Sequence, residues 1–331
     1  MARMVPAESP ASDDVTAQLT CWHVGLPASE LQHDHGVVAF TAAEIESAGK
    51  IAASTISVHD AVKLPLPLSD RVEIHLPGFR GKSLLPVLSW LATTRLAKPG
   101  AEVIWQVSKQ QGPDSVRRLL GELGWTLKRD RQGRVIFLRG VCPPSATLPP
   151  PQSFAAVLGK KRIELLADYG IFSPKRIDDG TSLLLDIALQ QPPIETVADI
   201  GIGYGAVAIG IVLNRVATGT VGTDVDGLAL WLAEQNARAH SVPIRLACTP
   251  DPAAVEFTSL TVCNVPTHID RQQSVRFMAG LAERARHGRL LAVVHTSLEA
   301  RYAQHLTAAG LHVHRHPGTA HVVLDANVRQ R

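Results

Sequence analysis

A strand that runs into closely spaced glycines is the feature that most constrains how this chain folds. Residues 196–206 read T-V-A-D-I-G-I-G-Y-G-A, in which Gly201, Gly203 and Gly205 separate an apolar strand from a helical stretch. Glycine lets the backbone turn sharply and approach a ligand closely, and the first turn of a helix presents N–H groups without partners. Alternating glycines are costly in regular structure, so packing alone does not account for them. The segment therefore predicts a strand–loop–helix unit that binds a ligand.

Short β-branched runs alternate with amphipathic helical stretches after this loop. We expect strands at 196–200, 220–224, 259–263 and 289–294, helices at 206–215, 228–240, 272–286 and 298–309, and a closing hairpin of 311–316 and 321–325. Such alternation is typical of a parallel sheet covered by helices on both faces. The fold class predicted is α/β, with an antiparallel strand at the end of the sheet.

The length of 331 residues predicts two domains. The segment 142–153, C-P-P-S-A-T-L-P-P-P-Q-S, contains five prolines and no charge, which is typical of a linker. We therefore expect one domain at 1–141 and a second at 154–331. The first domain shows runs in the same order as the second, and three Pro or Gly landmarks recur 186 to 189 positions later: Pro77 and Pro266, Gly100 and Gly288, Gly124 and Gly310. We interpret this as a duplicated domain, although any two α/β units look alike at this level of detail.

Composition limits the partners. The net charge of +3 is too small to mark the whole chain as a nucleic-acid binder, so a basic surface has to be local. The N-terminus lacks the apolar core of a signal peptide, which predicts a soluble cytoplasmic protein without a membrane partner. The four cysteines form no C-x-x-C pair, and the alternating His312, His314 and His316 have no carboxylate or cysteine in a ligand-like pattern. We expect no metal.

Two ligands compete for the glycine loop. Gly201, Gly203 and Ala206 satisfy the dinucleotide pattern G-x-G-x-x-A, which alone is weak. Asp199 lies two residues before the first glycine, where a carboxylate would repel a pyrophosphate but suits an ammonium group such as that of S-adenosylmethionine. Asp224 ends the next strand and can accept ribose hydroxyls in either case. Its neighbour Asp226 either substitutes for it or caps the following helix.

These segments resemble a known family. D-I-G-I-G-Y-G at 199–205, T-D-V-D at 223–226 and A-L-W-L-A-E-Q-N at 229–236 are similar to class I S-adenosylmethionine-dependent methyltransferases. Y-G-I-F-S at 169–173 and I-D-D-G-T at 177–181 more specifically resemble the segment before motif I in the small-subunit rRNA guanine-N2 methyltransferases of the RsmC type. Those enzymes are duplicated, with a degenerate N-terminal copy. The resemblance implies two tandem Rossmann-like, seven-stranded methyltransferase sheets, of which the first helps to bind RNA.

The resemblance also assigns roles to residues. It implies that Asp199 and the glycine loop bind the methionine moiety of the cofactor and that Asp224 or Asp226 binds the ribose. It also implies that Phe172 and Thr181 border the cofactor pocket. The family's N-P-P-F, which aligns the target amine, is replaced here by Asn264-Val265-Pro266-Thr267. Asn264 and Pro266 are the catalytic candidates, and Thr267 and His268 the substrate-binding ones. Losing the first proline would loosen the turn, and Thr267 offers no ring for stacking on a base.

The leading hypothesis is direct in-line transfer of a methyl group from S-adenosylmethionine to an exocyclic amine of guanine in rRNA, free or in the small ribosomal subunit. The alternatives are a small-molecule methyltransferase, a catalytically weak protein that binds cofactor or RNA, and a nicotinamide-dependent oxidoreductase. Three basic clusters could contact phosphates. They comprise Lys109, Arg117, Arg118, Lys128, Arg129, Arg131 and Arg134; Lys160, Lys161, Arg162, Lys175 and Arg176; and Arg271, Arg276, Arg284, Arg286 and Arg289.

Overall fold

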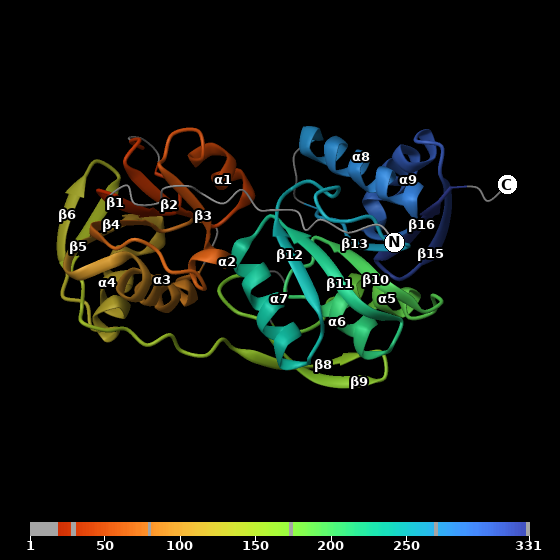
Figure 1. The fold of residues 1–331 in the computed structure, drawn as a ribbon, viewed down its shortest axis with the longest axis horizontal. Coiled ribbons are helices and arrows are strands. Elements are labelled where there is room, and N and C mark those ends of the chain that lie inside the picture. The colour runs from red at the N-terminus through yellow and green to blue at the C-terminus, as the bar shows by residue number, and fades with distance from the viewer. Residues whose placement is uncertain (1–18, 28–30, 79–80, 172–174, 268–270, 329–331) are drawn as a thin grey trace, which may run out of the picture.

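The chain folds into two halves that lie side by side, each built on its own sheet (Figure 1). The computed structural model describes residues 19–27, 31–78, 81–171, 175–267 and 271–328. The proline-rich segment 142–152 contains no helix or strand and runs from one half to the other (Figure 1). Within the described residues, no helix combines the length and the apolar character that crossing a membrane requires.

The first half contains a seven-stranded sheet in the order β3-β2-β1-β4-β5-β7-β6. Its strands are β1 (Cys21–Val24), β2 (His35–Ala39), β3 (Ser54–Ser57), β4 (Ser69–His75), β5 (Ala97–Ser108), β6 (Lys128–Gln132) and β7 (Val135–Val141). Its helices are α1 (Ala42–Ala48), α2 (Val58–Ala61), α3 (Leu85–Leu91) and α4 (Pro113–Glu122), with short helical turns at Lys82–Leu84, Ala92–Leu96 and Lys109–Gln111. Strand β7 runs antiparallel between β5 and β6.

The second half repeats this topology in the order β12-β11-β10-β13-β14-β16-β15. Its strands are β10 (Ile194–Ile200), β11 (Ala217–Asp224), β12 (Ile244–Cys248), β13 (Leu260–Asn264), β14 (Arg289–His295), β15 (His312–Pro317) and β16 (His321–Asn327). Its helices are α5 (Asp179–Ala188), α6 (Ala206–Leu213), α7 (Gly227–Ala239), α8 (Arg271–His287) and α9 (Thr296–Ala308). A hairpin of β8 (Ser153–Leu158) and β9 (Lys161–Leu166) precedes it. The expected α/β class, closing hairpin and tandem sheets are confirmed.

Local chemistry explains where the helices around the glycine loop begin. The Asp178 carboxylate accepts a hydrogen bond from the backbone N–H of Thr181 (3.0 Å) and starts α5. The Asp226 carboxylate does the same for α7 through the N–H groups of Leu228 and Ala229 (2.9 and 3.3 Å). Helix α6 is apolar on every side and is almost wholly buried, as expected for a helix inside the molecule.

The two halves match position by position near the start of each sheet. His23 lies opposite Glu73 on the neighbouring strand, as Asp199 lies opposite Val262. Two residues after His23, Gly25 has a φ of +81°, and two residues after Asp199, Gly201 has a φ of +75°. Ten residues separate β1 from β2, and their described part contains no helix, whereas α6 joins β10 to β11. The first half is therefore a reduced copy of the second.

Backbone hydrogen bonds join the halves beside the end of β11. The N–H of Ala42 donates to the carbonyl of Val225, and the N–H of Gly227 donates to the carbonyl of Phe40, both at 2.9 Å. A Cβ atom on Gly227 would lie 2.9 Å from Cγ1 of Val58, so a side chain there would push the halves apart. The first half thus contacts the same loop that carries Asp224 and Asp226.

Ion pairs extend this contact along α7. The Glu234 carboxylate on α7 lies 3.2 Å from Nε2 of His59 and 3.1 Å from Nζ of Lys63. Helix α2, which carries His59, packs directly on α7 (Figure 1).

Candidate active site

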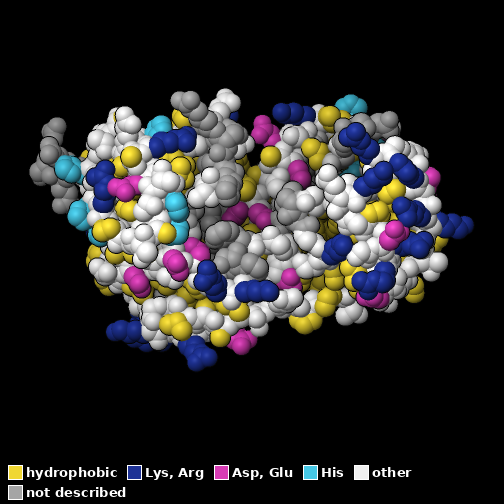
Figure 2. Space-filling view, turned by 180° about the vertical axis from the view of Figure 1, so that it is seen from behind, with side chains coloured by type: hydrophobic (Ala, Val, Ile, Leu, Met, Phe, Trp, Pro, Cys, Tyr) yellow, Lys and Arg dark blue, Asp and Glu magenta, His cyan; other side chains and the backbone are white. Residues whose placement is uncertain are grey.

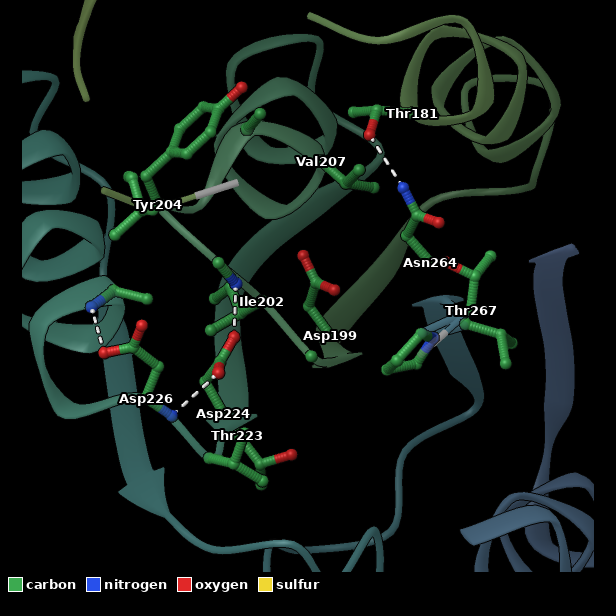
Figure 3. A pocket seen from close by; sticks show the side chains of 18 of the residues that line it. Thr181, Asp199, Ile202, Tyr204, Val207, Thr223, Asp224, Asp226, Asn264 and Thr267 are labelled. Atoms are coloured by element: carbon green, nitrogen blue, oxygen red, sulfur yellow. Dashed lines mark hydrogen bonds between the residues drawn. The ribbon is translucent and has the colours of Figure 1, made fainter. Parts of the chain in front are cut away.

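A cavity of about 390 Å3 opens at the carboxyl ends of the central strands of the second sheet. Parallel α/β sheets place their ligands at this edge. Most of the site residues expected from the sequence line it: Thr181, Asp199, Gly201, Gly203, Asp224, Asp226, Asn264, Pro266 and Thr267. Figure 3 shows Asp199 between Asp224 on one side and Asn264 on the other. The expected site residues Phe172 and His268 lie outside the described residues.

The glycine loop has the backbone shape that its sequence predicts. Gly201, Gly203 and Gly205 have φ values of +75°, +57° and +90°, in the left-handed region that favours glycine. No described atom lies within 4 Å of where a Cβ atom of Gly203 would stand, so this glycine leaves room beside the cavity. Gly205 differs from the other two, because it starts α6 and a Cβ atom there would lie 3.2 Å from Ile209 Cδ1. Gly205 serves helix packing.

Asp199 is a buried carboxylate aimed at the cavity. Its side chain is only 2% exposed, and Oδ2 accepts one hydrogen bond, from the N–H of Ala208 at 3.2 Å. Burial, with a smaller contribution from the nearby Asp224 carboxylate, raises the pKa of Asp199 to about 7. Within the described part of the chain, no Lys or Arg forms an ion pair with Asp199. A positively charged ligand would supply the missing partner.

Asp224 is held so that it faces the glycine loop. Its Oδ2 accepts from the N–H of Gly203 (2.8 Å) and its Oδ1 accepts from the N–H of Asp226 (2.9 Å). Burial raises the pKa of Asp224 to about 6, and the Asp226 carboxylate adds to the rise. Asp226 itself caps α7, which is the second of the two roles that its position predicted.

The side-chain amide of Asn264 is oriented by a chain of hydrogen bonds. The Thr181 hydroxyl donates to Oδ2 of Asp178 (2.5 Å), so its lone pair is left to accept from Nδ2 of Asn264 (3.0 Å). Because the Thr181 hydroxyl donates to Asp178, the atom of Asn264 that faces Thr181 is the amide nitrogen, and the amide oxygen points away from Thr181 (Figure 3). Asn264 therefore presents a hydrogen-bond acceptor to the cavity. Sequence reasoning placed Thr181 at the cofactor pocket, and the structure gives it this further contact.

Val265 occupies the position of the first proline in the family's N-P-P-F, and it holds the turn after Asn264 through a hydrogen bond that proline could not make. The N–H of Val265, which a proline would lack, donates to the carbonyl of Val293 at 3.0 Å. This hydrogen bond ties Val265 to β14, and the expected loosening of the turn stays a prediction. Thr267 is exposed at the mouth of the cavity.

Three residues that the sequence did not single out also line the cavity. Phe277 comes from α8, His295 ends β14 and His321 begins β16. The two histidine rings meet edge to face with centroids 5.6 Å apart, and Nδ1 of His321 is buried without a hydrogen-bond partner in the described residues. The strand order, which brings β16 beside β14, could have indicated the two histidines but not Phe277.

Two members of the third basic cluster are engaged by other residues of the second half. Arg284 is 1% exposed and donates to the carbonyls of Pro252, Val255 and Glu256 and to Oγ1 of Thr261, so it is a core residue. Arg289 is bound to the Asp325 carboxylate, with its NH2 group 2.6 Å from Oδ2. Helical charge patterns cannot distinguish such a buried arginine from a solvated one.

The chemistry of the cavity and a family model agree on its ligand. Two buried carboxylates beside a glycine loop suit the ammonium and ribose groups of S-adenosylmethionine, and residues 162–313 match the family model of the methyltransferase small domain. The chain is an S-adenosylmethionine-dependent methyltransferase. S-adenosylmethionine is its cofactor, and Asp199, Gly203 and Asp224 are the residues whose geometry fits it.

Relatives cover both halves of this methyltransferase. It is 25% identical over 276 residues to ribosomal RNA small subunit methyltransferase C of Hahella chejuensis, which covers 81% of the chain and 76% of the relative. It is 27% identical over 206 residues to the enzyme of the same name from Shewanella amazonensis, over 60% of the chain and 59% of the relative. The structure of the T. thermophilus 16S rRNA N2 G1207 methyltransferase (RsmC) in complex with S-adenosylmethionine and guanosine shares the fold. Its TM-score is 0.69 at 19% identity, over 94% of this chain and 88% of that one.

Proposed function

We propose that this methyltransferase methylates the exocyclic N2 amine of a guanine in small-subunit ribosomal RNA. The observation that carries the proposal is the fixed orientation of the Asn264 amide, whose oxygen faces the cavity because Thr181 holds its nitrogen. The two relatives named for small-subunit rRNA methylation, and the fold shared with an enzyme bound to guanosine, support the same substrate.

The chemistry needs positioning more than acid–base catalysis. S-adenosylmethionine supplies a methyl group on a sulfonium, which an amine lone pair displaces in line. Asp199 would hold the ammonium end and Asp224 the ribose. The Asn264 amide oxygen would accept one N–H of the target amine, so that the nitrogen lone pair points at the methyl group. Holding two reactants in such a geometry can supply about 7 to 11 kcal/mol of the barrier.

The base would rest on parts of the cavity that the sequence did not single out. Thr267 offers no ring, but Phe277 on α8 brings an aromatic side chain to the same cavity. Base–aromatic stacking contributes about 1 to 3 kcal/mol per base. The buried Nδ1 of His321 would form a hydrogen bond with an edge of the base. We assign base binding to Phe277 and His321 in place of the missing aromatic residue.

The RNA itself would lie across the basic surface of the first half. All seven residues of the first basic cluster, from Lys109 to Arg134, are exposed, and β6 is an edge strand of the sheet with every residue exposed. Figure 2 shows Lys and Arg side chains gathered over this half, on the right of the view. Arg118 and Arg129 pair with Glu122 and Asp114. The other five form no ion pair among the described residues, which leaves them for phosphates.

Methyl transfer to defined RNA fractions tests the proposal. Radiolabelled S-adenosylmethionine is incubated with naked rRNA, small subunits and large subunits, using the wild type, Asn264→Ala and the control Gln190→Ala, which alters an exposed amide on the loop after α5. We expect label in the small-subunit fraction or its rRNA, a loss of about 100-fold or more in Asn264→Ala because the amine is no longer aligned, and no change in the control.

Two results would overturn this function. Equal labelling by the wild type and Asn264→Ala would remove Asn264 from the reaction. Label in no RNA fraction, with S-adenosylmethionine binding intact by calorimetry, would indicate a small-molecule acceptor.

A further inference from the structure

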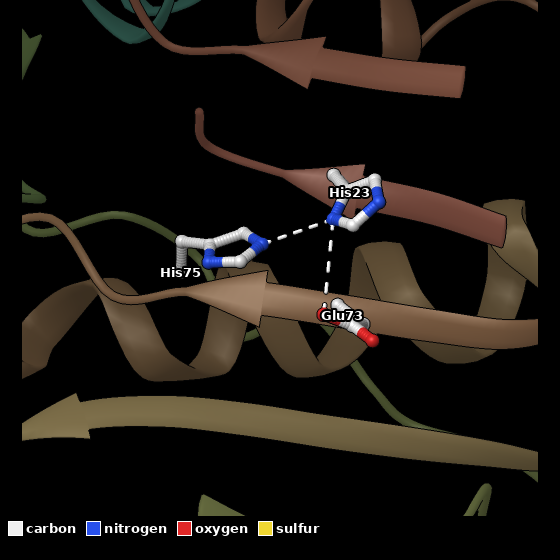
Figure 4. A group of neighbouring side chains, drawn as sticks. All are labelled: His23, Glu73 and His75. Carbon is white, nitrogen blue, oxygen red and sulfur yellow. Dashed lines mark hydrogen bonds and ion pairs between the residues drawn. The ribbon is translucent and has the colours of Figure 1, made fainter. Parts of the chain in front are cut away.

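Three potential metal ligands converge on one face of the first sheet (Figure 4). His23 on β1 and Glu73 and His75 on β4 each offer a ligand atom, and these atoms all lie within 4.8 Å of one another. Nδ1 of His23 is 3.0 Å from Nε2 of His75 and 3.9 Å from Oε2 of Glu73. The three residues meet because β1 and β4 are neighbours in the sheet, although 50 positions separate His23 from Glu73.

Outer hydrogen bonds hold two of these side chains in place. Nε2 of His23 lies 2.9 Å from Nδ1 of His35, so the second nitrogen of the ring has a partner of its own. The Glu73 carboxylate accepts two hydrogen bonds: Oε2 accepts from Nε2 of Gln106 at 3.1 Å, and Oε1 accepts from Nε of Arg71 at 2.9 Å. Metal-binding histidines and carboxylates are regularly oriented by such second contacts.

We propose that His23, Glu73 and His75 form a site for a divalent transition-metal ion, with zinc the best match to the donors. Zinc binds imidazole nitrogen at about 2.0 to 2.1 Å and carboxylate oxygen at about 2.0 to 2.2 Å, in tetrahedral geometry. Ligand atoms around such an ion lie about 3.4 Å apart. Two of the three separations, 3.0 and 3.9 Å, bracket this value, and the third is within 4.8 Å, so side-chain rotations would bring the three atoms around one ion. Water would take the fourth position.

The site lies where the second half has its own functional residues. His23 matches Asp199 by the strand register and by the glycine two residues later. His75 matches Asn264, because the N–H after each donates to the next strand: Leu76 to the carbonyl of Gln106 and Val265 to that of Val293. Two positions that face cofactor and substrate in the second half are thus imidazoles in the first.

The placement indicates a structural role for the metal. His23 is 4% exposed, and the side chain of Glu73 is 14% exposed. An ion here would tie β1 to β4 in the half whose described residues lack a helix between β1 and β2. We therefore expect metal binding to stabilise the first half while leaving the second half able to bind its cofactor.

The histidines of the second sheet are a poorer candidate. Nε2 of His316 lies 3.1 Å from Oδ2 of Asp325, and the same carboxylate is already neutralised by Arg289 at 2.6 Å. Among the described residues, no third His, Cys, Asp or Glu side chain joins His316 and Asp325 closely enough to complete a metal site.

Metal titration of the full chain tests the site. The purified protein is stripped with a chelator and titrated with zinc chloride by calorimetry, and cobalt(II) is added separately to report tetrahedral coordination by its visible absorption. We expect one equivalent of zinc to bind and to raise Tm. His75→Gln and the isosteric Glu73→Gln should each weaken zinc binding by about 100-fold or more, since even outer-shell changes cost 10- to 100-fold. His33→Ala and His314→Ala, which remove exposed histidines outside the cluster, should bind zinc as the wild type does.

Binding of S-adenosylmethionine by each variant shows that the second half is folded, and a circular-dichroism spectrum equal to that of the wild type shows that the first half is folded too. Absence of zinc binding in the folded wild type would overturn the proposal and leave only a chain of hydrogen-bonded histidines. Zinc binding that persists in both His75→Gln and Glu73→Gln, or that is lost in His33→Ala or His314→Ala, would also overturn it.

Discussion

Asp199 and Asp224 are carboxylates that change charge near neutral pH. Burial raises the pKa of Asp199 to about 7 and that of Asp224 to about 6. A ligand that carries an ammonium group binds the ionised carboxylate, so binding lowers this pKa and releases protons. The affinity for the cofactor is therefore greatest above pH 7 and declines as the pH falls through the pKa of Asp199 and then that of Asp224.

The first prediction concerns this pH dependence. Between pH 8 and pH 5, the Kd for S-adenosylmethionine should rise, approaching about tenfold per pH unit below the pKa of Asp199. Calorimetry in buffers of different ionisation enthalpy measures both the Kd and the protons released. Asp199→Asn should bind weakly with a flatter profile, whereas Asp186→Asn, an exposed change on α5, should follow the wild type. A Kd that is constant over this range would contradict the assignment of Asp199.

A second prediction tests the hydrogen bond that orients Asn264. Thr181→Val removes the acceptor of the Asn264 amide nitrogen, so the amide is free to rotate. We expect kcat to fall about 10- to 100-fold, which corresponds to about 1 to 3 kcal/mol for a broken buried hydrogen bond, with the cofactor Kd little changed. Thr181→Ser keeps the hydroxyl and should restore most of the rate. A rise in the cofactor Kd at unchanged kcat would instead make Thr181 a cofactor contact.

At the scale of elements, helix α8 is attached to the rest of the second half through Arg284. Its buried guanidinium donates to three backbone carbonyls in the segment before β13 and to Thr261. The third prediction is that Arg284→Met lowers the free energy of unfolding by about 3 kcal/mol or more, because buried acceptors lose charged donors. Urea denaturation measures the change. Arg286→Met, on the exposed side of the same helix, should cost about 0.5 kcal/mol or less, and equal effects of the two would refute the core role of Arg284.

The sequence predicted the second half better than the first for a physical reason. Strands such as β10 and β14 are runs of β-branched and aliphatic residues long enough to show their type. Strands β1, β2 and β3 have only four or five residues each, and β12 carries Arg245 in its middle, so none of them stands out from a loop. Their structure comes from pairing with distant strands, which a local pattern does not contain.

The same distinction applies to the site. Asp199 and Asp224 could be predicted because each lies at or next to the carboxyl end of a recognisable strand, whereas Asn264 was predicted from the resemblance of 264–267 to the family's N-P-P-F. His321 joins the cavity through the strand order, and Phe277 joins it through the packing of α8 on the sheet, neither of which a local pattern contains. The sequence also predicted no metal, and the site that we propose at His23, Glu73 and His75 has no local pattern, because strand pairing alone brings these residues together.

At the scale of the whole molecule, the first half offers positive charge and the second half offers the reactive site. The fourth prediction is that replacing Lys128, Arg131 and Arg134 with Gln weakens binding to the RNA substrate and reduces the slope of log affinity against log salt by about 2, as expected for three lost phosphate contacts. Filter binding over a range of salt concentrations measures the slope. Lys50→Gln, an exposed charge after α1, should leave it unchanged. An unaltered slope in the triple variant would place the RNA elsewhere.

The join between the halves bears on how such a chain can diverge. At the loop after β11, the contacts run from one backbone to the other, between Ala42 and Val225 and between Gly227 and Phe40. Main-chain bonds form with nearly any side chain in place, so substitutions can accumulate on both sides of the join without separating the halves. At this loop Gly227 is restricted in size, because a Cβ atom there would lie 2.9 Å from Val58 Cγ1, and along α7 the ion pairs of Glu234 with His59 and Lys63 restrict charge. Surface residues of the first half can therefore change during evolution while the second half keeps its active-site geometry.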